Sequence, residues 1–134
     1  MEHYELIKEA LKARKLSYSP YSKFKVGAAV LTRDGKVILG ANIENASYGL
    51  CMCAERNALY STYLKGYKKD DIVAIALIGK TAKAITPCGA CRQVMGELMP
   101  LDARVIMAST IKDVPLLIKT VGELLPFGFD GSDI

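Results

Sequence analysis

The residues best suited to chemistry are the four cysteines, which fall into two short clusters. The first cluster reads Cys51-Met52-Cys53-Ala54-Glu55, and the second reads Pro87-Cys88-Gly89-Ala90-Cys91. Each cluster opens a predicted helix, where unpaired amides and the positive end of the helix dipole lower the pKa of a thiol and prepare the sulfur for metal binding. In a chain that works in the reducing cytoplasm, where we expect this one, the pattern predicts zinc rather than a disulfide.

Two kinds of zinc site fit these clusters. In a structural site all four sulfurs complete a tetrahedron, so no position stays open and no carboxylate is needed. In a catalytic site Cys53, Cys88 and Cys91 bind the metal, water takes the fourth position, and Glu55 is the general base. The spacing favours the catalytic site, because a carboxylate two residues beyond a ligand is otherwise unexplained. A redox pair of Cys88 and Cys91 is a third alternative, which leaves Cys53 and Glu55 without a role.

Glu55 and Arg56, the two residues that follow Ala54, can each serve a catalytic zinc site. Three thiolates leave a zinc site with a net formal charge of about −1, which Arg56 can offset by hydrogen bonding to the ligand sulfurs. A surface ion pair is the alternative for Arg56, and a first-turn acid that favours the helix dipole is the alternative for Glu55. Residues two apart on an ideal helix point to opposite sides. Cys53 and Glu55 can therefore share a site only if Cys53 lies at the helix cap.

Composition and charge exclude several other classes of protein. With 134 residues, 51% of them apolar, we expect one domain spanning residues 1–134. The single histidine, His3, disfavours catalysis built on histidine. The longest apolar run, residues 72–78, is too short for a membrane helix, and the start resembles no secretory signal. Lysines and arginines are scattered despite the net charge of +4, so we expect neither a nucleic-acid nor a membrane partner.

Hydrophobic periodicity and turn residues predict a layered α/β domain. We expect helices over residues 2–15, 54–65 and 88–98, strands over residues 26–31, 36–41, 72–78, 104–109 and, more weakly, 116–120, and a short helix with an aromatic loop in the tail. Asp34-Gly35 predicts a hairpin between the first two strands, and Gly66 can end the second helix. The order strand, helix, strand over residues 72–109 indicates a parallel crossover.

Four segments carry a resemblance to a known family. They are YSPYSKFKVGAAV from Tyr18, GANIENASYGL from Gly40, CAERNAL from Cys53 and PCGACRQVM from Pro87, and they cover most of the chain in unbroken order. In these segments the chain resembles the small homotetrameric cytidine deaminases, zinc enzymes in which a Glu follows one ligand and P-C-x-x-C supplies the others. The tail, with LLPFGF, and the charged segment after Gly66 depart from the family's usual pattern.

The resemblance implies a fold and a reaction. The fold is a three-layer α/β/α arrangement with a mixed five-stranded sheet, and the chain is a cytoplasmic homotetramer with one Zn²⁺ per chain and shared active sites. The reaction is hydrolysis of a cyclic amidine C–N bond, converting cytidine and deoxycytidine to uridine and deoxyuridine with release of ammonia in pyrimidine salvage. Glu55 would take a proton from water and pass it to N3 of the ring. The rivals are a deaminase for a cytosine-nucleoside antibiotic and a non-catalytic four-cysteine zinc module.

A second set of residues suits a nucleoside. Asn42 and Glu44 are two apart in an extended segment, so they face the same way and can bind sugar hydroxyls. A solvated pair of polar side chains in a loop is the alternative, which the residues alone favour. Glu44 would repel a nearby phosphate, which favours a free nucleoside, and the aromatic Phe24 can stack on the base or act as a core anchor. The resemblance implies substrate contacts for Phe24, Asn42, Glu44 and the Ala54 backbone. It also implies that residues 45–48, Tyr48 among them, and Phe129 reach a neighbouring subunit's pocket.

Overall fold

One five-stranded sheet organises the protein, whose computed structural model describes residues 1–132 and 134. The elements are α1 (His3–Arg14), β1 (Val26–Thr32), β2 (Val37–Ala41), η1 (Tyr48–Leu50), α2 (Ala54–Leu64), η2 (Lys69–Asp71), β3 (Ile72–Gly79), α3 (Gly89–Leu98), β4 (Arg104–Ser109), β5 (Leu117–Thr120) and α4 (Val121–Leu124). The expected helices and strands before the tail are confirmed to within one residue at each end. The single 3-10 turns η1 and η2 were not predicted.

The sheet is mixed, as expected. Its strand order is β2-β1-β3-β4-β5, and only the central pair of β3 and β4 is parallel. The predicted hairpin joins β1 to β2, with Gly35 at a φ of 87°. The predicted crossover also forms, because α3 lies between the two parallel strands in the chain. Gly66, at a φ of 96°, follows the end of α2 in the left-handed conformation that suits a glycine.

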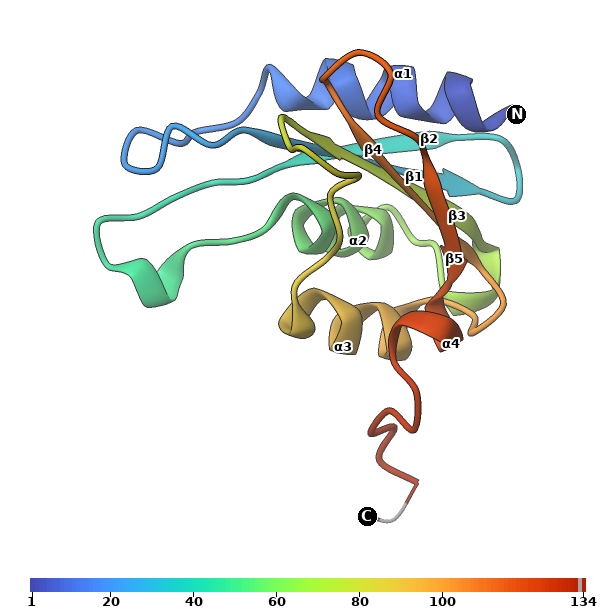
Figure 1. Ribbon diagram of the computed structural model, residues 1–134. Helices are drawn as coiled ribbons and strands as arrows, with labels where there is room; N and C mark the ends of the chain where they lie inside the picture. Colours follow the sequence, from blue (N-terminus) through green and yellow to red (C-terminus); the bar gives the residue numbers. More distant parts are fainter. Residues whose placement is uncertain (133) are drawn as a thin grey trace.

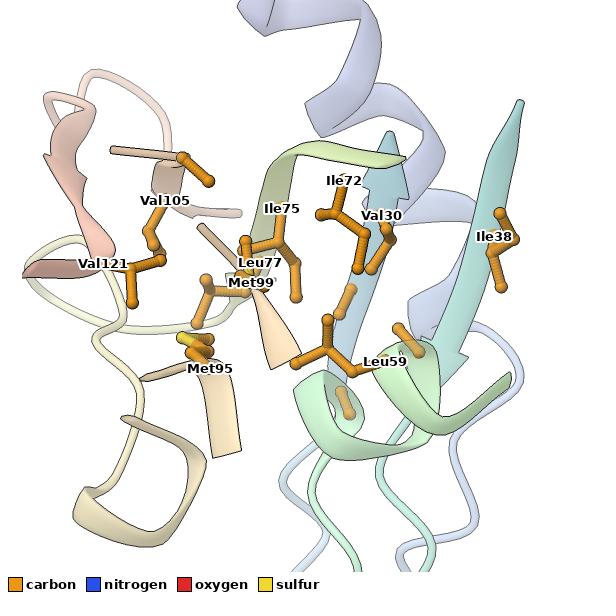
Figure 2. Close-up of a cluster of buried hydrophobic side chains, with 14 of the residues drawn as sticks. Val30, Ile38, Leu59, Ile72, Ile75, Leu77, Met95, Met99, Val105 and Val121 are labelled. Atoms are coloured by element: carbon orange, nitrogen blue, oxygen red, sulfur yellow. The ribbon is translucent and has the colours of Figure 1, made fainter. Parts of the chain in front are cut away.

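Helices cover both faces of the sheet, which gives three layers (Figure 1). On one face α1 buries Leu6 and Ala10 against alternate residues of the central strands. On the other face lie α2, α3 and α4, whose apolar side chains pack on the larger core. Figure 2 shows Leu59 of α2 and Met95 of α3 pointing toward the strands in this core. The three-layer α/β/α prediction is therefore confirmed.

Two glycines allow helices to lie unusually close to the sheet. A Cβ at Gly40 of β2 would lie 2.4 Å from the Ala58 nitrogen of α2, and a Cβ at Gly27 of β1 would lie 2.0 Å from the Ala10 oxygen of α1. Real Cβ atoms do not approach backbone atoms so closely, so these helices can reach their positions only over glycine. Gly40 therefore sets the distance between the sheet and α2.

The fold brings the starts of α2 and α3 together. Both helices lie on the same face of the sheet and begin on the same side of the molecule (Figure 1). Cys53 is the N-cap residue of α2 and Cys88 is the N-cap residue of α3. The two cysteine clusters, which are far apart in the sequence, thus meet in space.

Replacement of Gly40 by Ala is expected to destabilise the protein by at least about 1–3 kcal/mol, since the added methyl group must push α2 away from β2. Gly49→Ala is the control, because a Cβ there meets nothing within 4 Å. Thermal and urea unfolding of the two variants and the wild type measure the difference. A Gly40→Ala protein as stable as Gly49→Ala would contradict the close approach.

Candidate metal centre and active site

Three cysteine sulfurs form one compact group. The Sγ atoms of Cys53, Cys88 and Cys91 all lie within 4.8 Å of one another, and Cys91 is fully buried in the first turn of α3. Cys53 has extended backbone, with φ −74° and ψ 154°, so it precedes the regular helix as the sequence requires. Because of this cap, Cys53 and the helical Glu55 can serve the same site although they are two residues apart.

Cys51 lies outside this group. Its Sγ accepts a hydrogen bond from the Asn45 amide at 3.3 Å and donates one to the Asn45 carbonyl at 3.5 Å. Among the residues that the structure describes, the only metal-binding group consists of the other three cysteines. The geometry therefore does not support a site closed by all four sulfurs.

The surroundings of the sulfurs favour a thiolate at Cys53. The pKa of Cys53 is lowered to about 5, chiefly by a hydrogen bond from Cys91 and also by Arg56. The pKa of Cys91 is raised by its interaction with Cys53 and by burial. Arg56 Nη2 donates to Cys53 Sγ at 3.2 Å, so its guanidinium contacts one of the three clustered sulfurs.

The donor set fits zinc. Three soft sulfur ligands are suited to a zinc ion, and three protein ligands leave the fourth tetrahedral position open, as in catalytic sites. The N-termini of α2 and α3 and the Arg56 guanidinium supply positive charge to offset the thiolates. Arg56 Nε is buried and has no hydrogen-bond partner among the described residues. The group of three ligand sulfurs therefore matches an open zinc site better than a closed one.

Glu55 is buried beside the sulfurs. Its side chain is only 5% exposed, in the first turn of α2. Burial raises its pKa to about 7, and the negative charge of Cys53 adds to the effect. A carboxyl group with a pKa near neutrality can both accept and donate a proton at physiological pH. The burial of Glu55 favours a role in the site over that of a first-turn acid that only interacts with the helix dipole.

Asn42 and Glu44 both turn toward residues 17–26. Asn42 Oδ1 accepts from the Val26 amide at 2.9 Å and from the Ser17 hydroxyl at 2.6 Å, while Nδ2 donates to the Phe24 carbonyl at 2.8 Å. Glu44 accepts hydrogen bonds from the Tyr21 and Ser22 amides, each at 3.1 Å, and from the Ser22 hydroxyl. These bonds leave one Nδ2 hydrogen of Asn42 and further lone pairs of Glu44 free for a ligand.

The other expected contact residues are less closely gathered. Ala54 is fully buried at the start of α2, directly after Cys53, and Phe24 is 39% exposed. Tyr48 is 74% exposed and meets the Tyr21 ring edge-on, with centroids 6.3 Å apart. Phe129 is 64% exposed, and its carbonyl accepts a hydrogen bond from Gln93 at 2.8 Å. Within one chain the structure does not bring Tyr48 or Phe129 to the sulfur group.

A shallow hollow adjoins Glu44. It has a volume of about 300 Å³ and is lined by Tyr21, Ser22, Glu44, Tyr48 and Cys51. Its lining is mostly apolar, and it includes the polar residues Ser22 and Glu44. Such a mixture suits a small ring with hydroxyl groups.

Three residues with positioning contacts were missed by the sequence reasoning. Ser22 binds Glu44, Asn57 Nδ2 donates to the Ala41 carbonyl at 2.8 Å, and Arg92 Nε donates to the Pro87 carbonyl at 2.8 Å. Asn57 thereby joins α2 to the end of β2, next to Asn42, and Arg92 fixes the residue before Cys88. A polar side chain one turn beyond a ligand in the same helix is a weak signal that could have pointed to Asn57 and Arg92.

Comparison with known proteins decides the family. Residues 1–109 match the family profile of the cytidine and deoxycytidylate deaminase zinc-binding region. The chain belongs to this deaminase family. Cytidine deaminase of Halalkalibacterium halodurans is 52% identical over 134 residues, which cover 100% of this chain and 98% of that protein. Cytidine deaminase of Sporosarcina psychrophila is 40% identical, with coverage of 100% and 96%.

Solved structures of deaminases share the fold. The crystal structure of cytidine deaminase from Burkholderia pseudomallei superposes with a TM-score of 0.93 at 50% identity, over 96% of this chain and 100% of that one. Cytidine deaminase from Mycobacterium tuberculosis gives a TM-score of 0.79 at 33% identity, over 96% and 98%. The mixed sheet with helices on both faces is thus the fold of this deaminase family. In the described part of the chain, none of the helices has the length and apolar character needed to cross a membrane.

Replacement of Cys51 by Ser is expected to leave one zinc ion per chain, because the Cys51 sulfur stands outside the group of three. Cys88→Ser is the matched variant, and it should lose most of the zinc since it removes one of three ligands. Metal content after dialysis, measured by mass spectrometry, distinguishes the two. Equal loss of zinc from both variants would restore the four-sulfur site.

Proposed function

We propose that this protein hydrolyses cytidine and deoxycytidine to uridine and deoxyuridine with release of ammonia. The observation that carries the proposal is a buried carboxyl group, Glu55, next to three clustered sulfurs at two helix N-termini. Its membership of the deaminase family and the names of its relatives, which are cytidine deaminases, support the same reaction. This class of reaction needs a nucleophilic water and a group that moves protons.

Cys53, Cys88 and Cys91 would hold the zinc ion. When bound, zinc supplies Lewis acidity, which lowers the pKa of a water molecule at the open position. Arg56 would keep the Cys53 sulfur in its thiolate form through the hydrogen bond of 3.2 Å. The guanidinium and the two helix N-termini also reduce the negative charge of the sulfur group, which would otherwise weaken that acidity.

Glu55 would move the protons of the reaction. As a carboxylate it accepts a proton from the attacking water, and as a carboxylic acid it gives this proton to N3 of the cytosine ring while oxygen adds to C4. A further proton passes through the same carboxyl group to the departing amine, which leaves as ammonia. A pKa of about 7 suits this alternation because neither form is strongly favoured at neutral pH.

The substrate would be a free nucleoside rather than a nucleotide. Glu44 offers a carboxylate to the sugar hydroxyls, Asn42 offers its remaining amide hydrogen, and Phe24 offers a ring for the base. Hydrogen bonds from the Ser22 hydroxyl and the nearby amides lower the pKa of Glu44, so its charge would repel a phosphate. The Ala54 backbone at the start of α2 completes the contacts of this chain.

We also propose that the whole chain, residues 1–134, forms a single deaminase domain that assembles as a cytoplasmic homotetramer in pyrimidine salvage. Tyr48, Leu50, Phe127 and Phe129 expose much of their apolar surface in the single chain, and the first and last of these are candidates to complete a neighbouring pocket. Large exposed apolar side chains favour contact with another chain.

The reaction predicts a fall in ultraviolet absorbance when the zinc-loaded protein is incubated with cytidine, with one ammonia formed per uridine. Cytidine monophosphate should react at least tenfold less efficiently, because Glu44 repels its phosphate. The control is Glu55→Ala, which is expected to keep fold and zinc and to lose at least about 10²- to 10⁴-fold in kcat. Near-normal turnover in that variant, or no uridine from the wild type, would refute the proposal.

The assembly predicts a particle of four chains of 14.6 kDa each in sedimentation equilibrium. If active sites are shared, Phe129→Ala and Glu55→Ala subunits, each with low activity alone, should regain activity when they are mixed and reassembled. Glu55→Ala mixed with itself is the control. A fully active single chain would rule out shared sites.

A further inference from the structure

The loop before β1 is built around one hydroxyl group. Ser22 Oγ donates a hydrogen bond to Glu44 Oε2 and accepts one from the Phe24 amide, with a distance of 3.0 Å between N and O. Glu44 Oε1 accepts from the amides of Tyr21 and Ser22, so both carboxylate oxygens are held by the same turn. Ser22 thus connects the carboxylate of Glu44 to the backbone that carries the Phe24 ring.

The backbone between Ser22 and Phe24 is strained. Lys23 has a φ of 61°, in the left-handed region that is unfavourable for a residue with a Cβ. Such a conformation persists only where the surrounding bonds outweigh its cost. Here the Phe24 N–H donates to Ser22 and the Phe24 carbonyl accepts from Asn42, so the strained residue is followed by one whose backbone donor and acceptor are both bound.

The position of the Phe24 ring depends on this turn. A Cβ at Gly79, the last residue of β3, would lie 3.3 Å from the ring's Cζ, so the ring rests close to the end of that strand. The backbone of Glu44 is also held close to this turn, because its amide donates a hydrogen bond to the Tyr18 carbonyl at 2.8 Å. A charged acceptor makes the Ser22 bond stronger than a bond between neutral groups.

We propose that Ser22 is a positioning residue for the nucleoside, and that its hydroxyl fixes the Glu44 carboxylate and the Phe24 ring together in the arrangement that binds sugar and base. The inference rests on the proposed function, because it takes Glu44 and Phe24 as the residues that contact the substrate. Loss of the hydroxyl releases one oxygen of Glu44 and one amide of a strained turn. It leaves Cys53, Cys88, Cys91 and Glu55 untouched.

The test is steady-state kinetics of zinc-loaded Ser22→Ala with cytidine. We expect KM to rise about tenfold or more, as for loss of a hydrogen bond to a charged group, while kcat stays within about threefold and zinc content is unchanged. Ser22→Thr keeps the hydroxyl, and because Ser22 is exposed its methyl group has room, so this variant should restore KM to within about threefold.

Thr32→Val is the matched control at the other end of β1. Thr32 Oγ1 also donates to a carboxylate, that of Asp34, and accepts from a backbone amide, that of Lys36 at 3.0 Å. The control should lower the melting temperature without changing KM, which separates substrate positioning from loss of a structural hydroxyl.

Three results would overturn the proposal. An unchanged KM in Ser22→Ala shows that the hydroxyl does not position the substrate. A parallel fall of kcat and zinc content, or loss of folding, shows that it supports the fold instead. A Ser22→Thr protein as defective as Ser22→Ala shows that the hydroxyl is not the cause. If the wild type itself releases no uridine, the proposed reaction fails. The same data therefore distinguish failure of the proposed reaction from failure of the proposed role of Ser22.

Discussion

The central constraint of this structure is electrostatic: three cysteine sulfurs lie within 4.8 Å of one another, where they would repel each other as thiolates. Their mutual repulsion is reduced by two helix N-termini and by the Arg56 guanidinium, all of which present positive charge to the same point. This requirement explains why both cysteine clusters stand at helix starts, and why those helices lie side by side on one face of the sheet. Burial of Glu55 follows from the same arrangement, since the first turn of α2 is enclosed together with the sulfurs.

The sheet positions the two helices that carry these cysteines. The parallel pair of β3 and β4 requires a crossover, and α3 belongs to it, so Cys88 and Cys91 are delivered at the end where β3 finishes. On the edge of the sheet β2 carries Gly40, over which α2 approaches closely enough to bring Cys53 to the same end. Asn57 then binds the Ala41 carbonyl and links this helix to the segment that contains Asn42 and Glu44. Metal ligands and sugar-binding candidates thus share one scaffold.

Much of this could be predicted from the sequence, and the limits have physical causes. Periodicity predicted the elements because burial on one face has a fixed period in helices and strands, and the cap position of Cys53 followed from the direction of side chains two residues apart. The role of Ser22 could not be foreseen, because residues 22 and 44 meet only after β1 and β2 have paired. Lys23 in the left-handed region is likewise a consequence of tertiary bonds and not of its own preference. The expected places of Tyr48 and Phe129 involve a second chain, so the single-chain structure leaves them as predictions.

The side chain of Asn42 has a consequence for engineering. Its side-chain amide binds the Phe24 carbonyl, the Val26 amide and the Ser17 hydroxyl, and so joins them in one hydrogen-bonded group at the start of β1. Only one amide hydrogen of Asn42 is left for a ligand. Any replacement of Asn42 that is meant to alter sugar preference will therefore also loosen the start of a central strand. A substitution that favours a new substrate at this position will thus lower the stability of the fold. Directed evolution toward modified sugars should therefore begin with residues outside this hydrogen-bonded group, or with a parent protein that has first been stabilised at other positions.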